Sequence, residues 1–291
     1  MVSSMKAEQE MTLLEALQSI HPGSSNRTLR HMLTQARVTI DGVMEKRAKA
    51  VLSPGSLIEV HPKPVSSVEQ MRGIIHEDEE IIVVSKPAGL LTVATDKMES
   101  DTLHSRVQNH LQQSGADEWG FIVHRLDKET SGIIIFAKTE TAKQILQHQF
   151  SERQVKRYYT AIVEGEPEDE GTAIDWLIED RNLRVWVVDE NTTNAREAIT
   201  HWSVLERNET TSKIELEIET GRRHQIRVQM AEIGHPLVGD IRHGSKIKSS
   251  RLLLHATTLS FTHPNGNHLT LHSTLPNEFE KRNLLEVKDM D

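Results

Sequence analysis

The sequence predicts an α+β protein, with a small domain of mixed helices and strands followed by a larger domain on a mixed, largely antiparallel sheet. Strand-like alternation of apolar and polar residues dominates after residue 70, and the helical segments there do not alternate regularly with the strands. Asn265-Gly266 stands between two alternating runs, which is typical of a β-hairpin. Regular strand–helix alternation would instead have indicated a doubly wound sheet.

The small domain is expected to hold two helices and two short strands. Apolar residues with helical spacing begin at Leu13, and the pattern breaks at Pro22. A run of good N-capping residues at 24–26 marks the start of the second helix. The two strands are expected at residues 38–40 and 57–60.

A linker is expected after the second of these strands. Residues 62–70 have no apolar periodicity and contain a Pro-x-Pro sequence. We therefore assign residues 1–61 to the small domain and residues 71–291 to the large one.

The large domain is expected to hold strands of two kinds. Continuous apolar runs at residues 81–84 and 133–136 predict buried strands, whereas residues 214–218 alternate with glutamates and predict a strand with one solvent-exposed face. Residues 158–163 also read as a strand. Helical spacing appears at residues 142–150 and again at 226–230.

Composition limits the class of protein. The chain has 291 residues, no cysteine and a net charge of −9. No apolar run approaches the roughly 20 residues of a membrane helix, and the polar N-terminus lacks the core of a signal peptide, so we expect a soluble cytoplasmic protein without membrane contact. The negative charge argues against binding nucleic acid by overall charge, but it allows a local basic groove.

The strongest candidate site is the sequence His-Arg-Leu-Asp-Lys-Glu-Thr-Ser-Gly at residues 124–132. It forms a polar loop between two predicted strands. On spacing alone, a surface turn with a local ion pair is the simpler interpretation.

A second cluster of charge lies at residues 220–227, Thr-Gly-Arg-Arg-His-Gln-Ile-Arg. If this segment opens a helix, Arg223 and Arg227 share a face and repel each other. An acidic strand, a buried carboxylate or a phosphate would compensate them.

We expect no metal and no cofactor. The 16 histidines lack zinc-ligand spacing with a paired acid, and the one pair with that spacing, His268 and His272, falls on a predicted strand. Glycine-rich phosphate loops and the Gly-x-Ser-x-Gly sequence of hydrolases are also missing.

Several motifs in order give the chain a family resemblance. Residues 74–276 resemble the RluA-type RNA pseudouridine synthases, through segments 75–91, 124–132, 157–165, 220–228, 234–240 and 254–256. Residues 12–61 resemble more weakly the S4-like RNA-binding domain of a ribosomal small-subunit protein. The resemblance implies that residues 71–291 are a catalytic domain of pseudouridine synthase type and that the small domain binds RNA.

The resemblance also implies a reaction and its residues. The enzyme would be an isomerase that converts uridine in structured RNA to pseudouridine after flipping out the base, with no cofactor. Asp127 matches the catalytic carboxylate, Arg227 its counter-charge, and Tyr159 the residue that lies against the uracil. The matching substrate contacts are Arg125, Ile226 and His124.

Three positions depart from the family pattern and put the fit of the substrate in doubt. Arg223 replaces a usual small hydroxyl residue, Gln229 replaces a usual histidine, and the run Arg242-His243-Gly244 stands where Tyr-Gly is common.

The expected partner is RNA, either transfer or ribosomal, with the large-subunit ribosomal RNA favoured because of the accessory domain; the protein is expected to be a monomer. RNA contacts in the small domain are expected at Arg27, Arg30, Arg37 and Lys46. Two alternatives remain. One is a non-catalytic RNA-binding or ribosome-assembly factor on the same fold, and the other is an acidic hydrolase that uses Asp127 and Glu129.

Overall fold

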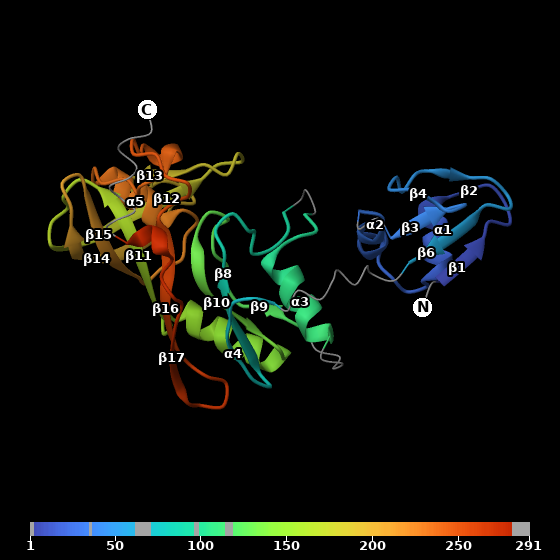
Figure 1. Ribbon diagram of the computed structural model, residues 1–291, viewed down its shortest axis with the longest axis horizontal. Coiled ribbons are helices and arrows are strands. Elements are labelled where there is room, and N and C mark those ends of the chain that lie inside the picture. The colour runs from blue at the N-terminus through green and yellow to red at the C-terminus, as the bar shows by residue number, and fades with distance from the viewer. Residues whose placement is uncertain (1–2, 35–36, 62–70, 96–98, 114–118, 281–291) are drawn as a thin grey trace. The chain divides into compact units, whose positions relative to one another are not determined.

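The computed structural model describes residues 3–34, 37–61, 71–95, 99–113 and 119–280, so the linker expected at 62–70 lies outside the described residues. Backbone contacts divide the chain into two compact units (Figure 1). One contains residues 1–70 and 94–101, and the other contains residues 71–93 and 102–291.

The first unit has the two expected helices and more strands than expected. Its elements are β1 (Ser3–Lys6), β2 (Met11–Thr12), α1 (Leu13–Ile20), α2 (Asn26–Thr34), β3 (Val38–Ile40), β4 (Val43–Met44), β5 (Val51–Leu52) and β6 (Leu57–Val60). An antiparallel sheet has the strand order β1-β6-β3-β4, and β2 pairs with β5. Strand β1 was not predicted because Ser-Ser-Met-Lys contains a single apolar residue, Met5, which pairs with Ile58 of β6.

The helices of this unit begin where the sequence places good caps. The hydroxyl of Thr12 accepts a hydrogen bond from the backbone N–H of Glu15, and the Glu15 side chain accepts one from the backbone of Thr12. Leu13 and Leu17 of α1 are buried together with Leu29 of α2. Burial of this apolar face stabilises helices that would be too short to persist alone.

The second unit is built on one large sheet. Its strands are β7 (Ile74–Glu77), β8 (Ile81–Lys86), β9 (Phe121–Ile122), β10 (Ser131–Ala137), β11 (Lys156–Glu164), β12 (Glu170–Glu179), β13 (Val185–Val188), β14 (Arg196–Arg207), β15 (Thr211–Ile218), β16 (Leu254–Thr262) and β17 (His268–His272). The strand order is β13-β12-β14-β15-β11-β16-β10-β8-β7, with β17 on β16 and β9 on β10. Among the described pairs only β10–β16 is parallel, so the predicted largely antiparallel sheet is confirmed.

The described part of this unit also contains three α-helices and two short 3₁₀ turns: α3 (Leu103–Gln113), α4 (Glu140–Ser151), α5 (Gln225–Glu232), η1 (Ile241–His243) and η2 (Asn277–Phe279). Helix α4 packs against β9, β10 and β16, and α5 packs against β12, β13 and β14 (Figure 1). Helix α3 was not predicted, although its buried Leu103, Val107 and Leu111 have helical spacing. No helix in the described part of the chain is long and apolar enough to cross a membrane.

Strand β10 anchors the loop that precedes it. All seven of its residues are buried, and it lies between β8 and β16. Gly132 has a φ of 115°, and a Cβ at this position would come within 2.1 Å of the carbonyl oxygen of Ala256. Glycine is therefore required where β10 meets β16, directly after the loop that carries Asp127.

The helix expected from the spacing at residues 226–230 is confirmed, but the whole arginine-rich segment does not open it. Helix α5 starts at Gln225, so Arg223 lies before the helix and does not share a helical face with Arg227. His224 precedes the helix in a left-handed conformation, with a φ of 53°. The two arginines have different acidic partners, Glu179 for Arg223 at 3.4 Å and Asp240 for Arg227 at 2.6 Å.

Candidate active site

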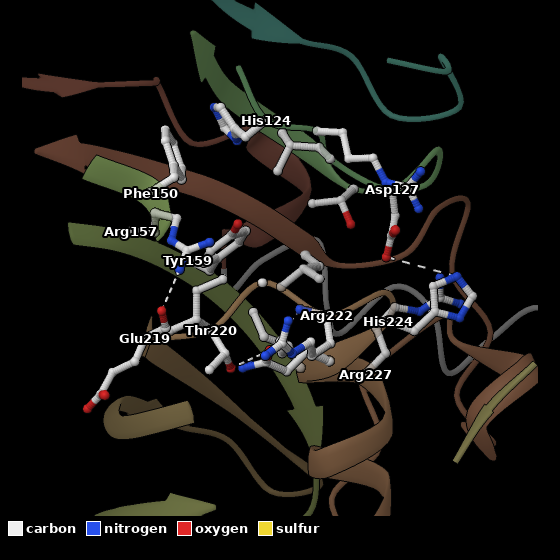
Figure 2. Close-up of a pocket in the computed structure, with 18 of the residues that line it drawn as sticks. His124, Asp127, Phe150, Arg157, Tyr159, Glu219, Thr220, Arg222, His224 and Arg227 are labelled. Carbon is white, nitrogen blue, oxygen red and sulfur yellow. Dashed lines mark hydrogen bonds and ion pairs between the residues drawn. The ribbon is translucent and has the colours of Figure 1, made fainter. Parts of the chain in front are cut away.

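A cavity of about 470 Å³ brings the two polar motifs together (Figure 2). Its walls come from the loop before β10, the end of α4, strand β11 and the segment that leads into α5. It is lined by His124, Arg125, Leu126, Asp127, Thr130, Phe150, Ser151, Arg153, Arg157, Tyr159, Ile218, Glu219, Thr220, Gly221, Arg222, His224, Gln225, Ile226, Arg227 and Leu254. All six site residues predicted in the large domain are therefore brought together.

The loop that carries Asp127 is held by hydrogen bonds to its backbone. The ammonium group of Lys86 donates to the carbonyl oxygens of Pro87, Leu90 and Lys128 at 2.8–3.0 Å. Lys86 is almost fully buried, and burial lowers its pKa to about 8 against the opposing charge of Asp127. Lys86 therefore ties the loop after β8 to the residue that follows Asp127.

A threonine holds the other side of the same loop. The hydroxyl of Thr92 donates to the carbonyl oxygen of Leu126 at 2.8 Å and accepts from its backbone N–H at 3.2 Å. The backbone N–H of Gly89 also donates to the carbonyl oxygen of Lys128 at 2.9 Å. Because the neighbours on both sides of Asp127 are fixed, its carboxylate is held in the cavity at little further cost in backbone entropy.

Asp127 is a carboxylate in a poorly hydrated place. Its side chain is 22% exposed. Burial raises the pKa of Asp127 above its ordinary value, and the charges of Arg227, Arg223 and Arg125 oppose that rise. The surrounding arginines thus favour the ionised form of Asp127, but their effect on its pKa is smaller than the opposing effect of burial.

Arg227 has a different direct partner from the one expected. Its Nε and Nη2 donate to the two carboxylate oxygens of Asp240 at 2.6 and 2.7 Å, and His243 also contacts this carboxylate through Nδ1 at 2.9 Å. Arg227 remains the largest favourable charge near Asp127. It is a shared counter-charge rather than the exclusive partner of Asp127.

His224 lies next to the proposed catalytic carboxylate, although the sequence analysis gave it no role. Its Nε2 is 3.9 Å from a carboxylate oxygen of Asp127, and its ring meets that of His243 edge to face with centroids 5.2 Å apart. Burial, together with the charge of Arg227, lowers the pKa of His224 to about 3. The ring is therefore neutral near pH 7. Its left-handed backbone, which aims it at Asp127, leaves no signal in the residue pattern.

Tyr159 and Ile226 give the cavity its apolar walls. Tyr159 lies on β11 at an irregularity in the pairing with β16, and Ile226 lies in the first turn of α5. Both side chains are buried. Burial raises the pKa of Tyr159, against the opposing charge of Arg157, so its phenol stays neutral near pH 7 and is a weak base.

His124 and Arg125 occupy different positions although they are adjacent in sequence. The Nε2 of His124 accepts a hydrogen bond from the backbone N–H of Ile135 at 3.2 Å, and its ring stacks on Phe150 with centroids 4.6 Å apart. Burial lowers the pKa of His124 to about 3, so it forms a neutral wall of the cavity. Arg125 is exposed at the edge of the cavity.

The family model described as RNA pseudouridylate synthase matches residues 80–232, more than half of the chain. This chain belongs to the RNA pseudouridylate synthase family. The matched segment contains Asp127, Tyr159 and Arg227.

Named relatives agree with this assignment. The chain is 33% identical over 252 residues to an uncharacterized RNA pseudouridine synthase of Mycoplasma pneumoniae, covering 80% of each chain. It is 35% identical over 263 residues to another from Aquifex aeolicus, covering 85% of this chain and 82% of the relative. It is also 38% identical over 221 residues to the ribosomal large subunit pseudouridine synthase D of Neisseria meningitidis, covering 70% of this chain and 58% of the relative.

Solved structures are similar in fold. The human RNA pseudouridylate synthase domain containing 4 aligns with a TM-score of 0.63 and 25% identity, covering 74% of this chain and 92% of that structure. The human RNA pseudouridylate synthase domain containing 1 aligns with a TM-score of 0.60 and 23% identity, covering 72% of this chain and 85% of that one.

The three departures from the pattern of RNA pseudouridine synthases have separate structural consequences. Arg223 lies 3.4 Å from Glu179 and adds positive charge near Asp127. Gln229 is fully buried and bonds to the Thr200 hydroxyl and to backbone carbonyls of β12 and β14. His243, in the third departure, contacts Asp240 together with Arg227. None of them removes a group from the proposed catalytic set.

The RNA contacts predicted in the small domain lie on the first unit. Arg27 and Arg30 are exposed on α2, and Lys46 is exposed after β4. Arg37 is less available because its Nε donates to the carbonyl oxygen of His61 at 2.9 Å. Among the residues that the structure describes, no group of three or more histidine or acidic side chains is placed to bind a metal ion.

Proposed function

We propose that this protein isomerises specific uridines in structured RNA to pseudouridine, with Asp127 as the catalytic carboxylate. The position of Asp127 carries the proposal. It lies in a cavity of about 470 Å³ between an apolar wall and arginines, in a chain of the RNA pseudouridylate synthase family. A cavity of this size falls in the range that takes small ligands, which runs from roughly 300 to 1,000 Å³.

The reaction exchanges one bond for another. The bond between ribose carbon 1 and the base nitrogen breaks, the detached uracil turns, and carbon 5 of the base bonds to the same ribose carbon while losing its proton. Asp127 begins this sequence either by attacking the sugar or by taking a proton from it. Both routes need the ionised carboxylate, which Arg227, Arg223 and Arg125 favour.

The remaining side chains hold the flipped base and its backbone. We assign Tyr159 and Ile226 to contacts with the two faces of the uracil. His124, whose neutral ring stacks on Phe150, is assigned to the wall of the cavity around the base. Arg125, exposed at the edge of the cavity, is assigned to contact with the RNA. Flipping costs roughly a few kcal/mol, which these contacts must offset.

Ribosomal RNA of the large subunit is the proposed substrate class, supported by the relative from Neisseria meningitidis that is named for this RNA. We also propose that the protein acts as a monomer in the cytoplasm. We assign residues 1–61 as an S4-like RNA-binding domain, joined through residues 62–70 to the catalytic domain at 71–291.

The direct test is conversion of RNA by the purified protein. Large-subunit ribosomal RNA made without modifications is incubated with the protein and then digested to nucleosides. We expect pseudouridine, release of tritium from uridine labelled at carbon 5, and unchanged RNA mass. Cleaved RNA would indicate a hydrolase instead, and unchanged uridine would indicate a binding protein.

The RNA-binding role of the first unit has its own test. Replacing Arg27, Arg30 and Lys46 with Gln removes three exposed cations, so we expect KM for RNA to rise by about tenfold or more while kcat stays near normal. The matched control is Arg47→Gln, because Arg47 is exposed but already paired with Glu45 at 2.7 Å. Equal KM values for the triple variant and the control would overturn this role.

A further inference from the structure

The cavity has a second charged end that the proposed chemistry does not use. Figure 2 shows Asp127 and His224 at one side of the site, and Phe150, Arg157 and Glu219 at the other. Three arginines line this second end: Arg153, Arg157 and Arg222. We call them the arginine end of the cavity.

Arg157 is held in place but not neutralised by its contacts. Its Nη2 donates to the backbone carbonyl oxygen of Glu219 at 2.8 Å, and its guanidinium carbon lies 5.5 Å from the centre of the Phe150 ring. Its Nε is buried and has no hydrogen-bond partner among the described residues. Such an unmatched donor is costly unless something binds there.

A glycine makes room for this guanidinium. A Cβ at Gly221 would come within 2.7 Å of Nη1 of Arg157. Gly221 has no positive φ that would require glycine for the backbone itself. A side chain at this position would therefore require the Arg157 guanidinium to shift.

Arg222 adds a second cation that is also fixed through a carbonyl group. Its Nε donates to the backbone carbonyl oxygen of Glu197 at 2.9 Å. Burial lowers the pKa of Arg222, and the charges of Arg196 and Arg153 lower it further. These arginines therefore repel one another, and an anion bound among them would relieve that repulsion.

The nearby carboxylates pair with Arg153 at the rim and with His201, and not with Arg157 or Arg222. Glu197 pairs with Arg153 at 2.7 Å, and Glu219 pairs with His201 at 2.9 Å and more distantly with Arg153 at 3.6 Å. Arg157 and Arg222 instead bond to backbone carbonyl groups. Arg157 and Arg222 thus keep positive charge that no carboxylate pairs with directly among the described residues.

We propose that Arg157 and Arg222, with Arg153 at the rim, form a phosphate-binding subsite for a phosphodiester next to the flipped uridine. The subsite rests on the proposed function and extends it to the RNA backbone. Guanidinium groups match phosphate oxygens in charge and in fork geometry. A neutral uracil would leave the repulsion among these arginines uncompensated, so a phosphate fits better than the base.

The test measures how salt weakens RNA binding. A short oligouridylate labelled with fluorescein is bound to the full-length protein carrying Asp127→Asn, so that turnover does not interfere, and Kd is measured by anisotropy over a range of KCl concentrations. Each lost phosphate contact should reduce the slope of log Kd against log salt by roughly one. For Arg157→Gln and Arg222→Gln we also expect Kd to rise about tenfold.

Two further variants make the result specific. Arg207→Gln is the matched control, because Arg207 bonds to Asp169 and Pro167 and does not line the cavity. Gly221→Ala displaces Arg157 without removing charge, so it should weaken binding as Arg157→Gln does. If circular dichroism shows that Arg157→Gln does not fold, Arg222→Gln tests the phosphate subsite in its place, because Arg222 is partly exposed.

Slopes and Kd values of Arg222→Gln and Gly221→Ala equal to those of the control would overturn the subsite. Pseudouridine formation by the wild-type enzyme is measured separately. If wild type forms pseudouridine while the slopes stay unchanged, the subsite alone is wrong. If no pseudouridine forms, the proposed function is wrong whatever the slopes are.

Discussion

Asp127 and Asp240 are both influenced by the charge of Arg227, yet their surroundings differ. Asp240 is 1% exposed and accepts two hydrogen bonds from Arg227 and one from His243. Burial acts to raise its pKa, but these bonds prevail and hold the pKa of Asp240 well below its usual range. For Asp127 burial prevails, and its pKa is raised.

The contrast separates a structural carboxylate from a reactive one. Asp240 accepts the hydrogen bonds that Arg227 donates from Nε and Nη2, and it thereby fixes the position of that guanidinium. Asp127 receives the field of Arg227 and a hydrogen bond from the backbone of His224, whose neutral ring lies 3.9 Å away. An incompletely compensated carboxylate in a cavity is expected where a group must react rather than stabilise.

The largest effect should come from removing the reactive carboxylate. For Asp127→Asn we expect turnover to fall by about 10⁴-fold or more. Because burial raises the pKa of Asp127 in the folded protein, its ionised form costs stability at neutral pH, so the variant should melt at a higher temperature than wild type at pH 7.

The matched control is Glu129→Gln, which removes an exposed carboxylate two residues away. It should leave turnover near normal and the melting temperature unchanged. Loss of activity in this control comparable to that in Asp127→Asn would favour the alternative in which both carboxylates act.

The next largest effect should come from the structural carboxylate. Asp240→Asn leaves Arg227 buried without its partner, so we expect about 3–5 kcal/mol of destabilisation at pH 7, measured by urea unfolding. Since the folded pKa of Asp240 is lowered, its contribution is present above its ordinary pKa near 4 and is lost as pH falls further. The difference from wild type should therefore shrink at pH 3.

A surface ion pair provides the comparison for this variant. Asp169 pairs with Arg207, but its side chain is 91% exposed. Asp169→Asn should change stability by less than about 1 kcal/mol. Equal losses in the two variants would contradict a special role for Asp240.

A smaller effect should appear in the alkaline range through Lys86. Its pKa of about 8 in the folded protein lies below its ordinary value of 10.5, so the unfolded chain binds more protons between these pH values. Stability should rise with pH in that window, by on the order of 3 kcal/mol relative to Lys86→Met. If the free energy of unfolding changes with pH in the same way in wild type and Lys86→Met, the pKa of Lys86 is not lowered by burial.

The sequence predicted the strands around the site well, because their patterns are local. The buried run at residues 133–136, the half-exposed strand at 214–218 and the hairpin at Asn265-Gly266 all occur as expected. Ordered motifs also predicted which loops would meet. Alternation was weaker in β12, where exposed Ile174 interrupts the pattern, and this strand was not foreseen.

The finer geometry of the site depends on contacts between distant parts of the chain. Asp240 lies 13 residues after Arg227, and no spacing rule identifies it as the bidentate partner. His224 precedes α5 with a left-handed backbone, so Arg223 lies outside the helix, and no residue pattern indicates this. The arginine end was missed because Arg153 and Arg157 belong to segments remote from Arg222 in sequence.

The most direct test of the central claim is pseudouridine mapping of ribosomal RNA in cells that lack this protein. Restoring wild-type protein should return pseudouridine at specific uridines, and restoring Asp127→Asn at equal abundance should not. Immunoblotting and RNA binding by the variant would show that it is folded and present. Pseudouridine restored equally by Asp127→Asn would contradict the role of Asp127 as the catalytic carboxylate.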